Sequence, residues 1–196
     1  AGPTSLVRSV LHNVRTSIAR EKGLMDPAKR EFLWVERFPL VEYDADSKRW
    51  AAVHHPFTSP LLETEEDKKN LASDPGKVKA RAYDVVLNGQ EIGGGSIRIN
   101  KSDIQSQMFE LLGISEEEAK SKFGFLLEAF SYGAPPHGGI ALGLDRIMMI
   151  LAQKDSIRDV IPFPKTSRGV DLMVNAPGEA DLNQLVELGI RINKKQ

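Results

Sequence analysis

The chain is organised around residues 80–146, which open with ARAYDVVLNGQEIGGGSIRIN (80–100) and close with YGAPPHGGIALGLDR (132–146). Asn88-Gly89 stands between two apolar runs, which is the strongest short-range signal of a β-hairpin. We therefore expect residues 85–87 to lie on one strand, and Glu91, Ile92 and the following glycines to lie on its antiparallel partner.

Two acids and an arginine, Asp84, Glu91 and Arg98, recur at spacings of seven along this stretch. On one continuous strand an odd spacing places successive side chains on opposite faces, so the acids meet only if the turn resets the alternation. With the hairpin, Asp84 and Glu91 are predicted on adjacent rungs, where two carboxylates repel each other unless a cation lies between them. Arg98 offers the planar fork that suits a carboxylate or a phosphate. A bulged edge hairpin with solvated charges is the alternative interpretation.

The run Gly93-Gly94-Gly95 makes a poor strand, because each glycine loses backbone entropy and packs nothing. Its compensating use is a close approach of the backbone to something flat or bulky. These glycines lead into a strand and not into a helix, so they form neither a P-loop nor a dinucleotide-binding fingerprint.

A histidine pair, His54 and His55, ends the predicted strand 50–53 and is followed by two prolines, Pro56 and Pro60. The prolines fix an extended, rigid loop that would hold both rings in place. The alternative is that backbone carbonyls in the loop satisfy both histidines. Neighbours on a strand point apart, so a two-histidine metal site is not expected here.

Hydrophobic periodicity and capping signals predict the other elements. Before the hairpin, they are a helix over 5–21 ended by Gly23, a strand over 32–44 interrupted at Pro39, and a charged loop or helix over 62–79 that is short of apolar anchors. After the hairpin, two helices begin with the capping boxes Ser102–Gln105 and Ser115–Glu118. A strand over 140–142 follows, and then an apolar helix after Gly143 with Asp145 and Arg146 in its first turn. Exposed amides at such a helix start attract anions.

Composition bounds the class of protein. With 196 residues, 41% hydrophobic, and a net charge of -1, the chain can bury a core and gives no global argument for nucleic acid or membrane binding. It has no cysteine, so disulfides and thiolate metal sites are excluded. No apolar run approaches the roughly 18 residues that span a bilayer, and we expect a cytoplasmic protein. The start Ala1-Gly2-Pro3 indicates a processed product or an excised piece.

Taken together, these features predict a magnesium–nucleotide site with a small acidic co-substrate. Mg²⁺ usually takes one or two protein carboxylates plus substrate phosphates, which suits Asp84 and Glu91. Chemistry of this type needs positioning and charge neutralisation more than it needs a protein nucleophile.

A family resemblance sharpens this prediction. The segment GGIALGLDR (138–146) resembles motif 3 of class II aminoacyl-tRNA synthetases. Together with VHHPFTSP, LNGQEIGGGSIR, YGAPPHGG and SIRDVIPFPK, it resembles the carboxy-terminal part of the bacterial-type aspartyl-tRNA synthetases. The resemblance implies an α+β fold, part of the class II antiparallel β-sheet flanked by helices, and ATP-dependent formation of aspartyl-adenylate followed by transfer to tRNA(Asp).

The same resemblance implies a role for each site residue, and no protein nucleophile. His54, His55 and Arg98 would bind L-aspartate, and Asp84 with Glu91 would hold Mg²⁺. Glu91 and the helix-start residues would bind ATP, and a glycine-rich strand would form the floor of the nucleotide site. The helix-start residues are Gly143, Leu144, Asp145 and Arg146, and the floor residues are Gly93, Gly94, Gly95 and Ser96.

Several parts of the family pattern are missing from residues 1–196. There is no motif 1, no motif 2, no inserted domain and no anticodon-binding domain, so we expect the carboxy-terminal portion of a catalytic domain, not active alone, from a parent that forms a homodimer. Two alternatives remain open. One is a synthetase-like binding or regulatory module that does not aminoacylate, and the other is a related amino-acid ligase.

Overall fold

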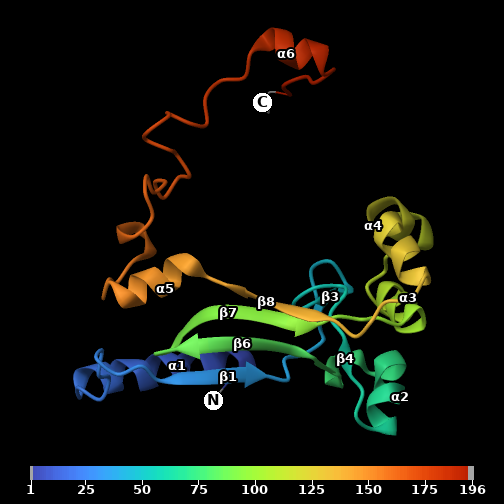
Figure 1. Cartoon of the computed structure of the whole chain (residues 1–196), viewed down its shortest axis with the longest axis horizontal. Helices are drawn as coiled ribbons and strands as arrows, with labels where there is room; N and C mark the ends of the chain where they lie inside the picture. The colour runs from blue at the N-terminus through green and yellow to red at the C-terminus, as the bar shows by residue number, and fades with distance from the viewer. Residues whose placement is uncertain (1, 194–196) are drawn as a thin grey trace. The chain divides into compact units, whose positions relative to one another are not determined.

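The computed structural model describes residues 2–193, and its contacts divide the chain into two units, 1–144 and 145–196. The first unit combines helices with antiparallel strands, which confirms the predicted α+β class. Its main sheet has four strands in the order β1 (Phe32–Glu36), β6 (Ala82–Leu87), β7 (Gln90–Ile97) and β8 (Gly138–Leu142), and Figure 1 shows β6 and β7 as its middle strands. The predicted hairpin is therefore the centre of the sheet and not its edge.

The hairpin turn forms at Asn88-Gly89, as predicted. Both residues have positive φ, 50° and 80°, the conformation of a two-residue type I′ turn. Leu87 pairs with Gln90 across it. The Asn88 side chain also reaches the segment before β1, since its Nδ2 donates to the Lys29 carbonyl at 2.9 Å and its Oδ1 accepts from the Glu31 amide at 2.9 Å. The turn thus locks β1 beside β6.

Two smaller antiparallel pairs complete the strands of this unit. One joins β2 (Val41–Asp44) to β3 (Arg49–Ala52), and the other joins β4 (Pro60–Leu61) to β5 (Lys79–Ala80). The predicted strand over 32–44 is interrupted as expected, because Arg37, with φ of 58°, and Phe38 to Leu40 separate β1 from β2.

The helices of the first unit are α1 (Thr4–Glu21), α2 (Glu65–Ser73), α3 (Ser102–Leu111) and α4 (Glu116–Ser131), with a 3₁₀ turn η1 (Pro75–Lys77). Ser115 caps α4 by accepting from the Glu118 amide at 3.2 Å, as expected. The capping box at Ser102 is wrong, because Lys101 is the N-cap of α3 and makes no side-chain cap. The stretch 62–79 was expected to be short of apolar anchors, and this too is wrong, since Leu71 and Val78 are buried.

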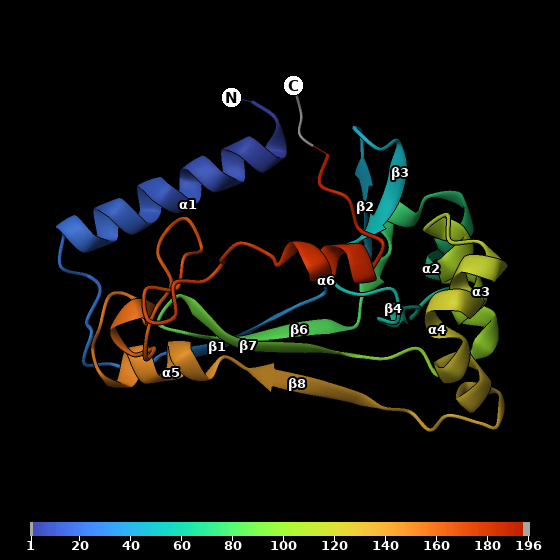
Figure 2. The same cartoon turned by 90° about the horizontal axis from the view of Figure 1, so that it is seen from above.

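The core lies at one end of the main sheet, where α2, α3 and α4 gather in both views (Figures 1 and 2). One hydrophobic cluster joins β2, α2, β5, β6 and α3. Its buried members are Leu40, Val41, Leu71, Val78, Ala80, Ala82, Ile99, Met108 and Leu112. A second cluster packs Phe57 against Phe109 and Ala119, with Phe123, Leu127 and Phe130 around them. Every residue of β1 and β8, by contrast, is exposed.

The second unit, described to residue 193, contains most of α5 (Leu144–Leu151), a 3₁₀ turn η2 (Ile157–Asp159) and α6 (Leu182–Glu187). The helix predicted after Gly143 is confirmed as α5. Within residues 2–193, no helix combines the length and apolar composition needed to cross a bilayer.

Candidate functional site

Strand register brings the two acids of the repeat to one face of the main sheet. Glu91 pairs with Val86, and Val86 lies two residues beyond Asp84 on β6, so Asp84 and Glu91 share a face. The turn therefore resets the alternation between them, as the sequence analysis required.

A β-bulge resets the alternation a second time, between Glu91 and Arg98. Val85 pairs with Gly93 while Val86 pairs with Glu91, which leaves Ile92 as the extra residue. Past the bulge, Gly94 pairs with Asp84, so residues 94, 96 and 98 follow on the face of the two acids. The sequence analysis did not place this bulge, although a glycine run in a strand is a common sign of one.

The two carboxylates are close enough to interact. Burial raises the pKa of Asp84, the neighbouring charge of Glu91 raises it further, and His54 opposes both with a smaller lowering effect. A cation between the acids would relieve the repulsion. Two carboxylates suit an ion, such as Mg²⁺, that completes its shell with water and phosphate. In the described part of the chain, no group of three or more metal-ligating side chains occurs.

The histidine loop runs alongside the end of β7. The Thr58 amide donates to the His55 carbonyl, and the Ile99 amide donates to the Phe57 carbonyl, each at 2.9 Å. The His54 ring stands edge-on to Phe38 with centroids 4.7 Å apart, and its charge acts on Asp84. The two histidine rings therefore lie in different surroundings, His54 beside the acids and His55 beside Arg98.

One tautomer of the neutral His55 ring is favoured by a backbone hydrogen bond. Its Nδ1 accepts a hydrogen bond from the Phe57 amide at 3.1 Å, so the neutral ring carries its proton on Nε2. Burial first, and the charge of Arg98 second, lower the pKa of His55 and favour this neutral form. The ring bond is to an amide and not to a carbonyl, which differs from the alternative considered from the sequence.

Arg98 presents a buried donor that lacks a partner. Its Nη1 is fully shielded from solvent and makes no hydrogen bond. Its backbone is fixed on both sides, because its amide donates to the His137 carbonyl at 2.9 Å and it bridges Thr58 across the loop. A buried donor left unpaired is costly, so this guanidinium is suited to a carboxylate or phosphate of a ligand.

Contacts inside the protein account for the close approach predicted at the glycine run. A Cβ on Gly95 would collide with the Gly139 carbonyl of β8, and one on Gly94 would collide with the Asp84 carboxylate. The close approach predicted for the glycines is thus to β8 and to Asp84. Ser96 is buried, and its hydroxyl lies 3.3 Å from that of the buried Thr58, a pair that the sequence analysis missed.

The helix-start residues divide between the two units. The Gly143 amide donates to the Ile92 carbonyl at 2.8 Å, which attaches the end of β8 to the bulge. Leu144 begins α5, and Asp145 and Arg146 lie in its first turn. Gly143 and Leu144 belong to the first unit, and Asp145 and Arg146 belong to the second.

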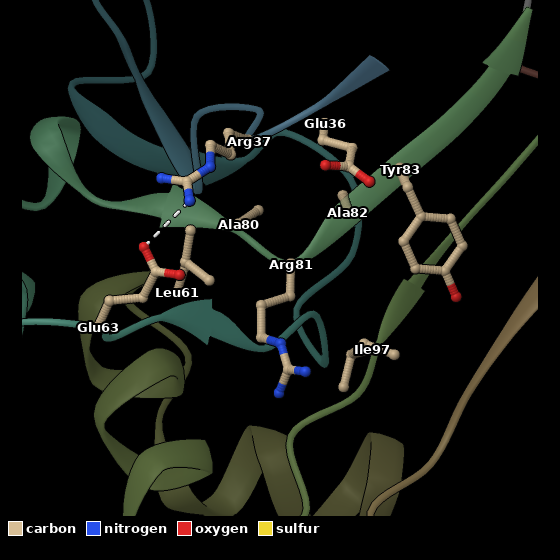
Figure 3. Close-up of a pocket in the computed structure, with 9 residues that line it drawn as sticks. All are labelled: Glu36, Arg37, Leu61, Glu63, Ala80, Arg81, Ala82, Tyr83 and Ile97. Atoms are coloured by element: carbon tan, nitrogen blue, oxygen red, sulfur yellow. Dashed lines mark ion pairs between the residues drawn. The ribbon is translucent and has the colours of Figure 1, made fainter. Parts of the chain in front are cut away.

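A shallow cavity of about 220 Å³ opens on the other face of the main sheet (Figure 3). Tyr83, the neighbour of Asp84 on β6, lines it together with Arg81 and Glu36, and an ion pair of 3.2 Å joins Arg37 to Glu63 at its rim. None of the predicted site residues lines this cavity, so the candidate site and the cavity are separate surfaces.

Comparisons with known proteins agree on one family. The family model described as tRNA synthetases class II (D, K and N) matches residues 9–167. The aspartate–tRNA(Asp/Asn) ligase of Geotalea uraniireducens (strain Rf4) is 56% identical over 97% of this chain and 32% of that protein. The aspartate–tRNA ligase of Staphylococcus carnosus (strain TM300) is 56% identical over 98% of this chain and 32% of its own length. The chain thus spans about a third of these relatives.

Solved structures show the same kinship in the fold. An aspartyl tRNA synthetase from Entamoeba histolytica superposes with a TM-score of 0.51 and 26% identity, over 71% of this chain and 23% of that chain. An asparaginyl-tRNA synthetase from the same organism gives a TM-score of 0.51 at 23% identity, which supports the fold alone.

Proposed function

Because this chain belongs to the class II tRNA synthetases of the D, K and N group, we propose that it supplies the aspartate pocket and part of the ATP site of an aspartate–tRNA ligase. The buried, unpartnered Nη1 of Arg98 carries the proposal. It is a fixed donor that needs an acidic acceptor, and the side-chain carboxylate of aspartate is such an acceptor. Neutral His55 lies beside it and adds an Nε2 donor.

The nucleotide half of the proposed site lies on the sheet face of Asp84 and Glu91. These two carboxylates fit a Mg²⁺ ion, since burial and mutual repulsion raise the pKa of Asp84. Bound there with ATP, Mg²⁺ would neutralise phosphate charge. We assign Glu91, Gly143, Leu144, Asp145 and Arg146 to ATP, and the strand of Gly93, Gly94, Gly95 and Ser96 to the floor beneath it.

The proposed reaction needs no protein nucleophile. The α-carboxylate of aspartate attacks the α-phosphate of ATP, and the bond to pyrophosphate breaks. A hydroxyl of the terminal ribose of tRNA(Asp) then attacks the aspartyl-adenylate, the bond between the acyl group and the phosphate breaks, and AMP leaves. In this scheme Arg98 and His55 bind and orient the side-chain carboxylate, so that only the α-carboxylate is presented to ATP. Pairing a charge with a charge also selects aspartate over asparagine, because the neutral amide would leave Arg98 without its ion pair.

Whole-protein properties are proposed for the complete gene product that contains these residues, because the chain spans about a third of the length of its relatives. We propose tRNA(Asp) charging from the names of these relatives, and a homodimeric assembly and a cytoplasmic setting from the family resemblance alone. The name of one relative includes both tRNA(Asp) and tRNA(Asn), which favours a second candidate, a ligase that charges both. Aminoacylation with each purified tRNA separates the two candidates.

The decisive experiment pairs ligand binding with catalysis. Calorimetric titration of this chain with magnesium ATP and with aspartate should show binding of both ligands. Aspartate-dependent ATP–pyrophosphate exchange by the complete gene product should be lost when aspartate is replaced by asparagine. Absence of exchange by the complete gene product, with or without binding, would overturn the ligase and favour a synthetase-like binding module or a different amino-acid ligase.

A further inference from the structure

Gln105 is an unusual residue for its place in the packed part of the first unit. It lies on α3 with 3% of its surface exposed, among the apolar side chains Met108, Phe109 and Leu112. In the part of the chain that the structure describes, the only other buried polar residues are Thr58 and Ser96, which bond to each other. A buried amide is costly unless both of its ends are paired, so its presence here needs a reason.

The bond that Gln105 makes is directed at the histidine loop. Its Nε2 donates to the Pro56 carbonyl at 3.1 Å, while its Oε1 is buried without a hydrogen-bond partner. Half of the amide is therefore unsatisfied, and an apolar residue such as methionine would avoid that cost. Gln105 thus costs stability in the core and yet bonds to one carbonyl of the loop, which indicates that the position of this carbonyl matters.

The Pro56 carbonyl is the point that governs His55. Its peptide runs directly into the Phe57 amide, which donates to Nδ1 of His55 at 3.1 Å and sets the tautomer of the ring. The Phe57 ring is itself clamped by aromatic neighbours, with Phe109 at 5.7 Å and Phe123 at 5.1 Å between centroids. Gln105 fixes the orientation of the peptide, and the aromatic cluster fixes the side chain that follows it.

We infer that Gln105 is a positioning residue, which holds the Pro56–Phe57 peptide so that the Nε2 donor of His55 lies beside Arg98 in the aspartate pocket. This inference rests on the proposed function. It predicts that Gln105 controls aspartate binding without affecting ATP binding, because the one hydrogen bond that its side chain makes to the described residues is to the loop.

The test compares Gln105→Met with Met108→Ala in the complete gene product. Methionine keeps the volume of glutamine and removes the donor, whereas Met108→Ala creates a cavity in the same helix, facing the other cluster. Gln105→Met should raise the KM for aspartate in pyrophosphate exchange by roughly tenfold, with the KM for ATP within about twofold of the parent. Met108→Ala should lower the melting temperature and leave both KM values within about twofold.

A second measurement is independent of catalysis. Nitrogen NMR of ¹⁵N-histidine protein, assigned with His55→Gln, should show a single Nε2–H tautomer for His55 in the parent and in Met108→Ala, and a tautomer mixture in Gln105→Met. An unchanged tautomer in Gln105→Met, or an equal rise in the aspartate KM of Met108→Ala, overturns the inference. If the parent itself lacks aspartate-dependent exchange, the proposed function fails, and the tautomer alone then decides whether Gln105 positions the loop.

Discussion

The two halves of the candidate site lie in contrasting surroundings. Arg98, which is half-buried, and His55, which is exposed, lie beside the packed end, the region of the two hydrophobic clusters that contain Phe57 and Met108. Asp84, which is half-buried, and Glu91, which is exposed, lie on the open sheet formed by β1, β6, β7 and β8. On the same face of this sheet, Leu33 and Val35 of the outer strand β1 are 52% and 37% exposed. A pocket built in a packed region is preorganised, whereas charges on an open sheet are solvated. We infer from this contrast that the proposed aspartate pocket is the more preorganised half of the site, and that the proposed metal site depends on weaker and more solvated electrostatics.

The largest effect should be a loss of stability at the packed end. Phe57 contacts the rings of Phe109, Phe123 and Phe130, so Phe57→Ala should lower the free energy of unfolding by about 3–5 kcal/mol. Phe32→Ala is the matched change on the open sheet, where this side chain is 64% exposed, and it should cost less than about 1 kcal/mol. Urea denaturation of the two variants measures the difference. Equal losses would mean that β1 is as well packed as the core.

The next effect should be catalytic. Arg98→Leu removes the proposed partner of the substrate carboxylate, so kcat/KM for aspartate activation should fall. The fall should correspond to a loss of about 3 kcal/mol or more of transition-state binding. Arg81→Leu is the control, because Arg81 is an exposed arginine that lines the cavity on the other face. Aspartate-dependent pyrophosphate exchange measures both variants. A value for Arg98→Leu within tenfold of the parent would remove Arg98 from the aspartate pocket.

A third prediction concerns the glycine strand that joins the two regions. Gly95→Ala places a methyl group against the Gly139 carbonyl, so β8 must shift, and we expect a loss of roughly 1–3 kcal/mol in stability. Gly139→Ala, one strand away, meets no atom within 4 Å and should be nearly neutral. Thermal unfolding of the pair compares them. If both alanines are tolerated equally, the glycines are not needed for strand packing, and their use as a ligand platform gains support.

The sequence predicted what short-range chemistry determines. Asn88-Gly89 specifies the hairpin because its two residues adopt positive φ, and Ser115 caps α4 through a bond three residues away. Arg98 was predicted as a ligand-binding residue from the properties of its own side chain, and that role stays a prediction. A bulge was considered only within the alternative of an edge hairpin, and its position at Ile92 was not predicted, because the position depends on pairing between strands.

The remaining misses have the same cause. Asn88 bonds to Lys29 and Glu31, Thr58 bonds to Ser96, and Gln105 bonds to Pro56, all between segments far apart in the sequence. The stretch 62–79 was predicted to be poorly anchored because its sequence contains few apolar residues. Two of these, Leu71 and Val78, are nevertheless buried in the hydrophobic cluster that other segments complete. Contacts of this kind depend on the assembled fold, so they cannot be inferred from periodicity or capping signals.

The smallest effect should come from the open sheet, as a pH and metal dependence of stability. The pKa of Asp84 is raised in the folded protein, so the folded state binds the proton more tightly than the unfolded state. The contribution of this carboxyl to stability is therefore full below its ordinary pKa of 3.8, and it is lost as pH rises through the raised pKa. Asp84→Asn removes that loss, and without metal it should gain on the order of 0.5 kcal/mol at neutral pH, the size of a solvated charge interaction. Millimolar Mg²⁺ should reverse the order, since it stabilises the parent by binding the carboxylate pair and has less to bind in the variant.

Melting temperatures of both proteins from pH 3 to 8, with and without MgCl₂, test this, and Asp103→Asn on the exposed surface of α3 is the control. A magnesium response that survives Asp84→Asn unchanged would show that the pair does not hold the ion, and the contrast between a preorganised pocket and a solvated metal site would then lose its second half.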